Sequence, residues 1–281
     1  MKKLIFLAGL AMAAIASAQV LNVEAPVQLN APAGDVKVAG ISADGSTLLL
    51  TTSSNVGLRR YDMATGEMTT LSEAAGAGYR AQISADGKTV TFREKSVGKD
   101  KMMRTELKQS VIGQRKAKVL VRPTRDMRLI SVSQTLEAVR PTATIENRQL
   151  VVTIGGVSTV ISPCGQDKSY IWPSISPDGQ RVLFYLSGKG AYVSDLAGKN
   201  VVYLGHDLRA PQWYNNEVVI GMNDRDNGEV IVSSEIIAVN MQGTRQVLTN
   251  GINAMYPYAA NGAIVCSGFQ GETYLIKVTK D

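Results

Sequence analysis

A short turn motif that returns along the chain constrains the fold of this sequence more than any other feature. Ser-Ala-Asp-Gly occurs at residues 42–45 and 84–87, and Ser-Pro-Asp-Gly occurs at residues 176–179. Each copy follows an isoleucine and precedes a strand-like run. With three degenerate copies, the motif defines six anchor residues spaced about 43 residues apart on average: Asp44, Asp86, Asn147, Asp178, Asn215 and Asn261. Such a period indicates a repeat architecture.

Each anchor has the residues of a β-hairpin turn. Asp-Gly or Asn-Gly between two apolar runs is a strong hairpin signal, because glycine accepts the left-handed backbone conformation that the turn requires. After Gly179 the chain alternates turn residues with apolar segments at residues 182–185, 191–195 and 201–204. Four short antiparallel strands in about 40 residues are typical of a β-propeller blade.

We therefore predict an all-β chain that forms a six-bladed β-propeller of four-stranded antiparallel blades over residues 36–281. The strand-like segment at residues 20–29 precedes the first blade, and we expect it to complete the last blade and close the ring. The long interval from Asp86 to Asn147 predicts an extended hairpin or loop in the second blade. The interval from Asn147 to Asp178 is short, so the sequence leaves the regularity of the third blade open.

Residues 1–18 have the features of a cleaved export signal. Lys2 and Lys3 precede an apolar stretch, and Ala16-Ser17-Ala18 matches a signal-peptidase site. We expect cleavage near Ala18, a single propeller domain over residues 19–281, and a location in the periplasm or outside the cell. No later stretch of 18 residues is apolar enough to predict a transmembrane span.

Part of the chain resembles a known family. Residues 176–205, SPDGQRVLFYLSGKGAYVSDLAGKNVVYLG, resemble the repeat of TolB-type periplasmic propellers, as do RAPQWYNNEVVIGM (209–222) and ETYLIKV (272–278). The resemblance is good over residues 172–240 and weak elsewhere. TolB has an α/β domain before its propeller, for which this chain has no room between Ala18 and the first anchor. The resemblance therefore implies a TolB-like propeller only, without a role in the Tol–Pal system.

The residue types that catalytic and metal sites need are scarce. His206 is the only histidine, whereas the propeller-shaped oligogalacturonate lyases use several with a metal, and no G-x-S-x-G motif occurs. Cys164 and Cys266 belong to different blades, which predicts two free thiols. Residues 223–229, NDRDNGE, lack the spacing of an EF-hand, so we expect a plain turn there, with a calcium site as the alternative. We expect no catalytic residues, no metal, no cofactor and no enzymatic activity.

A basic segment lies within an otherwise slightly acidic chain. From Arg93 to Arg128 there are twelve Lys and Arg residues against four Asp and Glu residues. We expect a basic patch that could attract an acidic partner, formed by Arg104, Lys108, Arg115, Lys116, Lys118 and Arg122. The alternative is a solvated hairpin without a partner. Nucleic acid is not expected, because the chain is predicted to be exported and the segment lacks interleaved aromatic residues.

A second candidate site follows from aligning the blades. About six residues before each anchor, the chain enters the innermost strand of a blade, so these positions should surround one mouth of the central channel. The candidate binding residues there are Tyr79, Arg80, Trp172, Arg209 and Tyr256. Aromatic and arginine side chains are enriched in protein-binding sites. Packing between blades is the alternative explanation.

From these observations we expect a monomeric exported protein that binds a protein or peptide partner through one face of the ring. The alternative is a carbohydrate-binding or glycan-processing protein of the cell envelope. The sequence does not identify the ligand.

Overall fold

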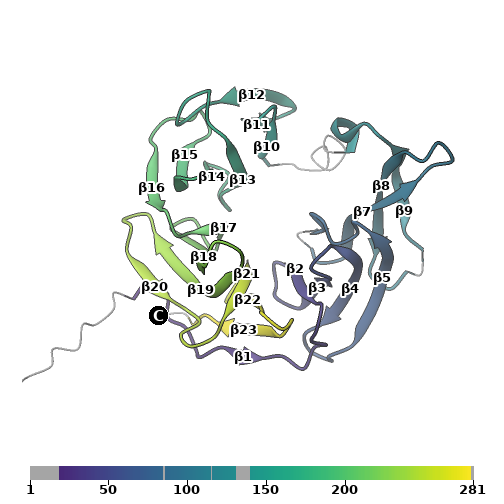
Figure 1. Cartoon of the computed structure of the whole chain (residues 1–281), viewed down its shortest axis with the longest axis horizontal. Coiled ribbons are helices and arrows are strands. Elements are labelled where there is room, and N and C mark those ends of the chain that lie inside the picture. Colours follow the sequence, from purple (N-terminus) through teal and green to yellow (C-terminus); the bar gives the residue numbers. More distant parts are fainter. Residues whose placement is uncertain (1–18, 85, 115, 131–139, 280–281) are drawn as a thin grey trace, which may run out of the picture.

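The computed structural model describes residues 19–84, 86–114, 116–130 and 140–279. Its strands form six antiparallel sheets arranged as blades around a central axis, which confirms the predicted six-bladed β-propeller (Figure 1). The predicted signal peptide, residues 1–18, lies outside the described residues.

The first three blades cover the N-terminal half of the ring. Blade 1 contains β2 (Lys37–Ile41), β3 (Thr47–Thr51), β4 (Val56–Asp62) and β5 (Met68–Ala75). Blade 2 contains β6 (Gln82–Ile83), β7 (Thr89–Val97), β8 (Met103–Val111) and β9 (Lys118–Thr124). Blade 3 contains β10 (Thr142–Glu146), β11 (Gln149–Ile154) and β12 (Val157–Ile161).

The other three blades complete the ring. Blade 4 contains β13 (Tyr170–Ile175), β14 (Arg181–Leu186), β15 (Gly190–Asp195) and β16 (Val202–Gly205). Blade 5 contains β17 (Arg209–Trp213), β18 (Val218–Asp226), β19 (Ile231–Asn240) and β20 (Arg245–Val247). Blade 6 contains β21 (Ala254–Ala260), β22 (Ala263–Gly268), β23 (Thr273–Lys277) and the N-terminal strand β1 (Val27–Gln28).

The N-terminal segment closes the ring as predicted. β1 pairs antiparallel with β23, with Val27 opposite Leu275, and an isolated bridge joins Val23 to Val278. The pairing is interrupted between these two points at Pro26, which has no N–H group to donate. The closing strand is therefore shorter than the predicted segment of residues 20–29, but it occupies the outermost position of blade 6.

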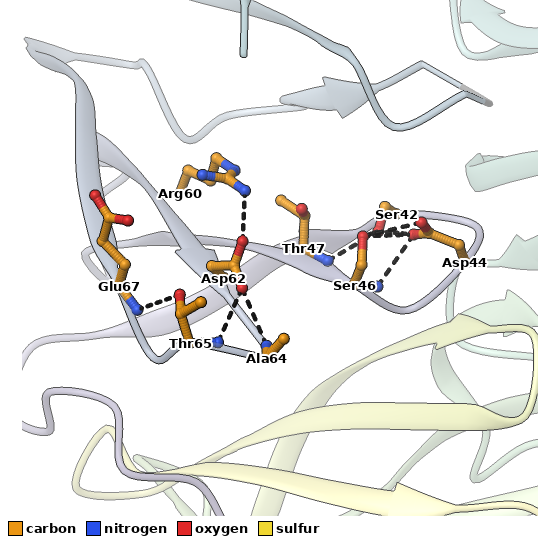
Figure 2. A network of polar contacts seen from close by, with 9 residues as sticks. All are labelled: Ser42, Asp44, Ser46, Thr47, Arg60, Asp62, Ala64, Thr65 and Glu67. Atoms are coloured by element: carbon orange, nitrogen blue, oxygen red, sulfur yellow. Dashed lines mark hydrogen bonds and ion pairs between the residues drawn. The ribbon is translucent and has the colours of Figure 1, made fainter. Parts of the chain in front are cut away.

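The anchors are the turns between the first two strands of each blade, and Figure 2 shows the first of them. In the first of them the Ser42 hydroxyl donates to the Asp44 carboxylate at 2.5 Å and accepts the backbone N–H of Thr47 at 3.0 Å. The same carboxylate accepts the backbone N–H of Ser46, and Gly45 has the left-handed φ of 74°. The contacts recur at the second and fourth anchors through Ser84, Asp86, Lys88, Thr89, Ser176, Asp178, Gln180 and Arg181. The repeated motif therefore encodes one turn, built from the same hydrogen bonds.

Hydrogen bonds also connect neighbouring anchor turns. The backbone N–H of Asn261 donates to the carbonyl of Ala43 at 3.2 Å, joining blades 6 and 1. The backbone N–H of Asp178 donates to the side-chain oxygen of Asn216 at 3.0 Å, joining blades 4 and 5. The anchors therefore gather at one end of the channel, and the starts of the innermost strands lie at the other end.

Blades 2 and 3 depart from the regular pattern. In blade 2 the predicted extended hairpin is present, with nine residues in each of β7 and β8. Blade 3, whose regularity the sequence left open, has three described strands. Residues 162–169 turn back at once from β12 to β13, and the Tyr170 hydroxyl fixes this turn by accepting the N–H of Cys164 and donating to the carbonyl of Gly165.

The hydrophobic core is divided into clusters that lie between neighbouring blades. Phe92 of blade 2 packs with Leu49 of blade 1, and Phe184 of blade 4 packs with Leu150 of blade 3. Because each sheet buries both faces against its neighbours, strands such as Arg181–Leu186 are almost continuously buried. The rigid blades hold the residues at each channel end in place.

Candidate binding site at the channel mouth

The predicted mouth residues lie where the innermost strands begin. Arg80 precedes β6, Trp172 lies within β13, Arg209 is the first residue of β17, and Tyr256 lies within β21. The first strands of neighbouring blades pack against each other through most of the ring. These side chains therefore belong to one end of the channel, opposite the anchor turns.

The backbone is strained at this end of several blades. Arg80, Trp172 and Tyr256 have left-handed φ values of 56°, 51° and 54°. A bulge accompanies the strain at Trp172 and at Tyr256, because the register of the innermost strand shifts there. A left-handed conformation costs a non-glycine residue about 1–2 kcal/mol. A bulge also turns a side chain away from the alternating direction of the strand, so the mouth residues do not follow the in–out pattern of the sheet.

Blades 4 and 5 contribute an aromatic pair and an ion pair. Trp172 is 39% exposed and its ring lies edge-on to that of Tyr185, with the centroids 5.2 Å apart. The Arg209 guanidinium lies 3.0 Å from the carboxylate of Asp224, whose side chain is only 2% exposed. The Ser234 hydroxyl donates to the other oxygen of that carboxylate at 2.6 Å. The buried acid therefore holds the exposed Arg209 side chain in place.

Blades 6 and 1 contribute an aromatic ring and a lysine. Tyr256 is 38% exposed, and the Lys37 ammonium lies 5.2 Å from the centroid of its ring. Burial lowers the pKa of Lys37, and the nearby Asp35 opposes this shift. Lys37 is not among the residues predicted from the sequence. It directly precedes Val38, which lies six residues before the anchor Asp44, and this position is the sequence signal that marks it.

Tyr79 and Arg80 continue the mouth onto blade 2. Tyr79 is 48% exposed, and the guanidinium of the buried Arg93 lies 5.6 Å from its ring centroid. The preceding Gly78 packs against Thr51 of blade 1 so closely that a Cβ atom would lie 2.0 Å from the Thr51 hydroxyl oxygen. Glycine at this position therefore lets the segment before β6 lie directly beside blade 1.

Contacts link these residues into one arc around the channel end. Met222, which pairs with Arg209 across the sheet, accepts the backbone N–H of Tyr256 on its sulfur at 3.1 Å. Lys37 pairs in register with Thr51, the residue that contacts Gly78. The arc therefore runs from blade 4 through blades 5, 6 and 1 to blade 2. It presents aromatic rings and cationic groups that can hold an extended, partly anionic chain.

The predicted basic patch is divided in the structure. Arg104 forms two hydrogen bonds with Asp100, each 2.7 Å long, and lowers the pKa of this acid to about 2. Lys108 lies 2.6 Å from Glu94 and 3.4 Å from Glu106. Arg115 lies outside the described residues. The other three members are exposed: Lys116, Lys118 and Arg122.

The remaining candidates lie apart from the mouth arc. His206 is 65% exposed and its Nδ1 atom lies 3.0 Å from the carboxylate of Asp207. Cys164 and Cys266 are free thiols, as predicted. Of the predicted turn at residues 223–229, residues 223–226 instead belong to β18, and the chain turns at residues 227–230, where Asp226 accepts the backbone N–H of Gly228. Within the described ranges, no three His, Cys, Asp or Glu side chains gather in a way that could hold a metal ion.

Comparison with solved structures supports the fold. A protein described as a candidate TolB from Agrobacterium tumefaciens is 13% identical, with a TM-score of 0.51, and the match covers 91% of this chain and 93% of that one. At this identity the likeness shows the fold alone, and it confirms the predicted TolB-like propeller. The sequence matches no protein-family model and no curated protein. No helix in the part of the chain that the structure describes is long and apolar enough to cross a membrane.

The comparisons correct the expectation that the chain is not an enzyme. An oligogalacturonate lyase from Vibrio parahaemolyticus is 12% identical with a TM-score of 0.44, covering 85% of this chain and 76% of that one. An oligogalacturonate lyase in complex with manganese is 14% identical with a TM-score of 0.46, covering 86% and 76%. The solved structures that match the chain therefore include enzymes, contrary to that expectation. Likenesses at this level assign no reaction to the chain.

Proposed function

We propose that this chain is an exported, TolB-like propeller that binds an extended segment of a protein partner across the channel mouth. The observation that carries the proposal is the continuous arc from Trp172 to Arg80, in which exposed aromatic rings alternate with cationic groups. Tyr, Trp and Arg side chains dominate the energetics of protein interfaces. The strained backbone at Trp172 and Tyr256 supports the same proposal, because such strain concentrates at binding sites.

Export and cleavage are part of the proposal. The signal-like residues 1–18 motivate it, and the first mature residue would be Gln19. Expression of the full chain in a bacterial host, followed by N-terminal sequencing of the periplasmic product, should therefore give a protein that begins at Gln19. A cytoplasmic product that retains Met1 would contradict this part.

The binding test uses two double variants matched by blade. Arg80→Asn with Trp172→Asn removes two mouth side chains, and asparagine is chosen because it tolerates the left-handed backbone at both positions. The control, Lys88→Asn with Gln180→Asn, changes exposed residues beside the anchor turns of the same two blades.

The immobilised proteins are cross-linked to envelope extracts and the captured proteins are quantified. We expect one set of partners to be recovered by the wild type and by the control, and to be lost with the mouth variant. Equal recovery by both variants would contradict a role for the mouth. A glycan array distinguishes protein binding from the carbohydrate alternative. Binding of a glycan that depends on Trp172 would favour the carbohydrate function instead.

A further inference from the structure

A cavity of about 340 Å³ lies on blade 2 beside the mouth arc. Its walls come from the extended hairpin of β7 and β8, from the end of β9 with the residues that follow, and from the segment before β6. A cavity of this size lies within the range of small-molecule binding sites, which begins at roughly 300 Å³.

Three cationic side chains line the cavity, and none of its described lining residues has a carboxylate. Arg93 and Lys95 project from the same face of β7, and Arg125 follows β9. Glu94, between the first two, lies on the opposite face, where it accepts hydrogen bonds from Lys108 and Ser72 at 2.6 and 2.7 Å. Strand alternation therefore separates the acid of this strand from its two cations.

The innermost cation is almost fully buried. Arg93 is 4% exposed, and its guanidinium lies 5.6 Å from the centroid of the Tyr79 ring, which also lines the cavity. Burial and the neighbouring Arg80 lower the pKa of Arg93, yet an arginine keeps its charge at neutral pH. The cavity therefore has a positive charge at its inner wall, where few water molecules can screen it.

The other walls are apolar or carry hydroxyl groups. Met103 and Met127 are half exposed to solvent and line the cavity, and methionine side chains adapt to varied apolar shapes. Thr105 and Thr124, which lie opposite each other in β8 and β9, add two hydroxyl groups. The lining thus combines a charged inner wall with a flexible apolar surface.

We propose that this cavity binds a carboxylate carried on an apolar body, either a small organic acid or the C-terminal residue of a peptide. The two oxygens of a carboxylate match the planar arginine donor group, and the apolar body would cover the methionine side chains. Inorganic phosphate lacks such a body and would leave these side chains in water. The cavity shares Tyr79 with the mouth arc, but Lys95 and Arg125 lie outside the arc, so substitutions at these two residues test the cavity separately from partner binding at the mouth.

Calorimetric titration of the purified protein tests the proposal with defined probes. The first pair is 4-phenylbutyrate and its carboxamide, and the second is a tetrapeptide ending in phenylalanine with a free or an amidated C-terminus. We expect each acid to bind at least about tenfold more tightly than its amide. The amide lacks the charged carboxylate and therefore loses a hydrogen bond to a charged group. The acid that binds more tightly identifies the source of the ligand.

Two double variants, which change the net charge by the same amount, test where the acids bind. Lys95→Glu with Arg125→Glu should weaken binding of the acids about tenfold or more, whereas Lys116→Glu with Arg122→Glu should leave it within about twofold. All four residues are exposed, so folding should be preserved, and thermal melts check this. Equal binding of acid and amide, equal effects of the two double variants, inorganic phosphate binding as tightly as the acids, or no binding at millimolar concentration would each overturn the proposal.

Discussion

At the residue scale, each of the three anchor turns with a Ser-Ala-Asp-Gly or Ser-Pro-Asp-Gly motif depends on one serine that has two hydrogen-bond partners. The buried Ser42 and Ser176 hydroxyls accept a backbone N–H at the start of the next strand and donate to the exposed aspartate of the same turn. This donated hydrogen bond is the main cause that lowers the pKa of Asp44 and of Asp178, and the equivalent contact does so for Asp86. The charged form of these acids is therefore favoured by folding.

The lowered pKa values predict how stability depends on pH. A carboxylate whose pKa is lower in the folded state stabilises the fold fully above its ordinary pKa, here 3.8, and this contribution is lost as the pH falls through the lower folded value. The triple variant Asp44→Asn, Asp86→Asn, Asp178→Asn should therefore be less stable than the wild type at pH 7. Below about pH 4 the difference should shrink.

Thermal melts between pH 2.5 and pH 7 measure this difference. Asp167→Asn serves as the control, because Asp167 is exposed and lies outside the anchor turns. The melting temperature of this variant should depend on pH as that of the wild type does. A triple variant whose melting temperature stayed a constant amount below the wild type at every pH would show that the charge of these aspartates is not involved.

The same scale shows what local sequence can predict. Gly45 and Gly179 were expected in left-handed turns and have φ values of 74° and 75°, because glycine is the residue that such turns select. Arg80, Trp172 and Tyr256 adopt equally left-handed conformations without a glycine. Tertiary packing imposes these conformations, so no local preference could reveal them.

At the element scale, the closing strand is held by side chains as much as by pairing. The Gln246 side-chain oxygen accepts the backbone N–H groups of Val20 and Leu21 at 2.7 Å, and its amide nitrogen donates to the carbonyl of Leu21. The Leu21 side chain is 8% exposed and belongs to the core between blades 5 and 6. Leu21→Ala should therefore cost about 2–3 kcal/mol in the free energy of unfolding.

Urea denaturation measures this cost, with Val27→Ala as the matched control. Val27 lies in β1 but is 57% exposed, so its truncation should change stability by less than about 0.5 kcal/mol. Equal effects of the two variants would mean that backbone pairing alone, and not the buried leucine, holds the ring closed.

The outer edge of blade 3 leads to a prediction about aggregation. β12 is the outermost described strand of its sheet, it contains no charged residue and no proline, and Val160 within it is 59% exposed. The outer strands of blades 1, 2 and 5 carry charges at Glu73, Lys118 and Arg245, which discourage pairing between edges. Val160→Lys should slow aggregation on heating, as measured by light scattering.

Val230→Lys is the control for the edge effect. Val230 is 60% exposed but lies in the turn between β18 and β19, so the substitution adds the same charge away from a strand edge. Equal slowing by both variants would assign the effect to net charge rather than to β12.

At the same scale, most strands of the fold could be predicted from the sequence, whereas the arrangement of blade 3 could not. The blade count and the long hairpin in blade 2 followed from the spacing of the anchors, because a propeller repeats one unit. The closing strand followed from the strand-like segment at residues 20–29 that precedes the first blade. The regularity of blade 3 was left open, and in the structure residues 162–169 lead directly from β12 into blade 4. The short interval from Asn147 to Asp178 signals the irregular blade, but the hydrogen bonds of the Tyr170 hydroxyl that stabilise this turn are not visible in the sequence.

At the scale of the whole molecule, the two cysteines report on different events. Cys266 has no exposed surface and lies in the same core cluster as Leu21, and burial raises the pKa of its thiol to about 12. Cys164 is partly exposed, and burial raises its pKa as well. Since the thiolate is the reactive form, a thiol reagent should label Cys164 in the native protein and reach Cys266 only when the ring opens.

Loosening the closing strand should therefore accelerate labelling of Cys266 alone. If Leu21→Ala costs about 2 kcal/mol, the open form becomes about 30-fold more populated, and labelling of Cys266 by iodoacetamide should speed up by the same factor. The rate at Cys164 should stay within about twofold, and Val27→Ala should change neither rate. Mass spectrometry of labelled peptides at timed intervals gives both rates. Labelling of Cys266 at a rate unaffected by Leu21→Ala would show that this core opens locally, without release of the N-terminal strand.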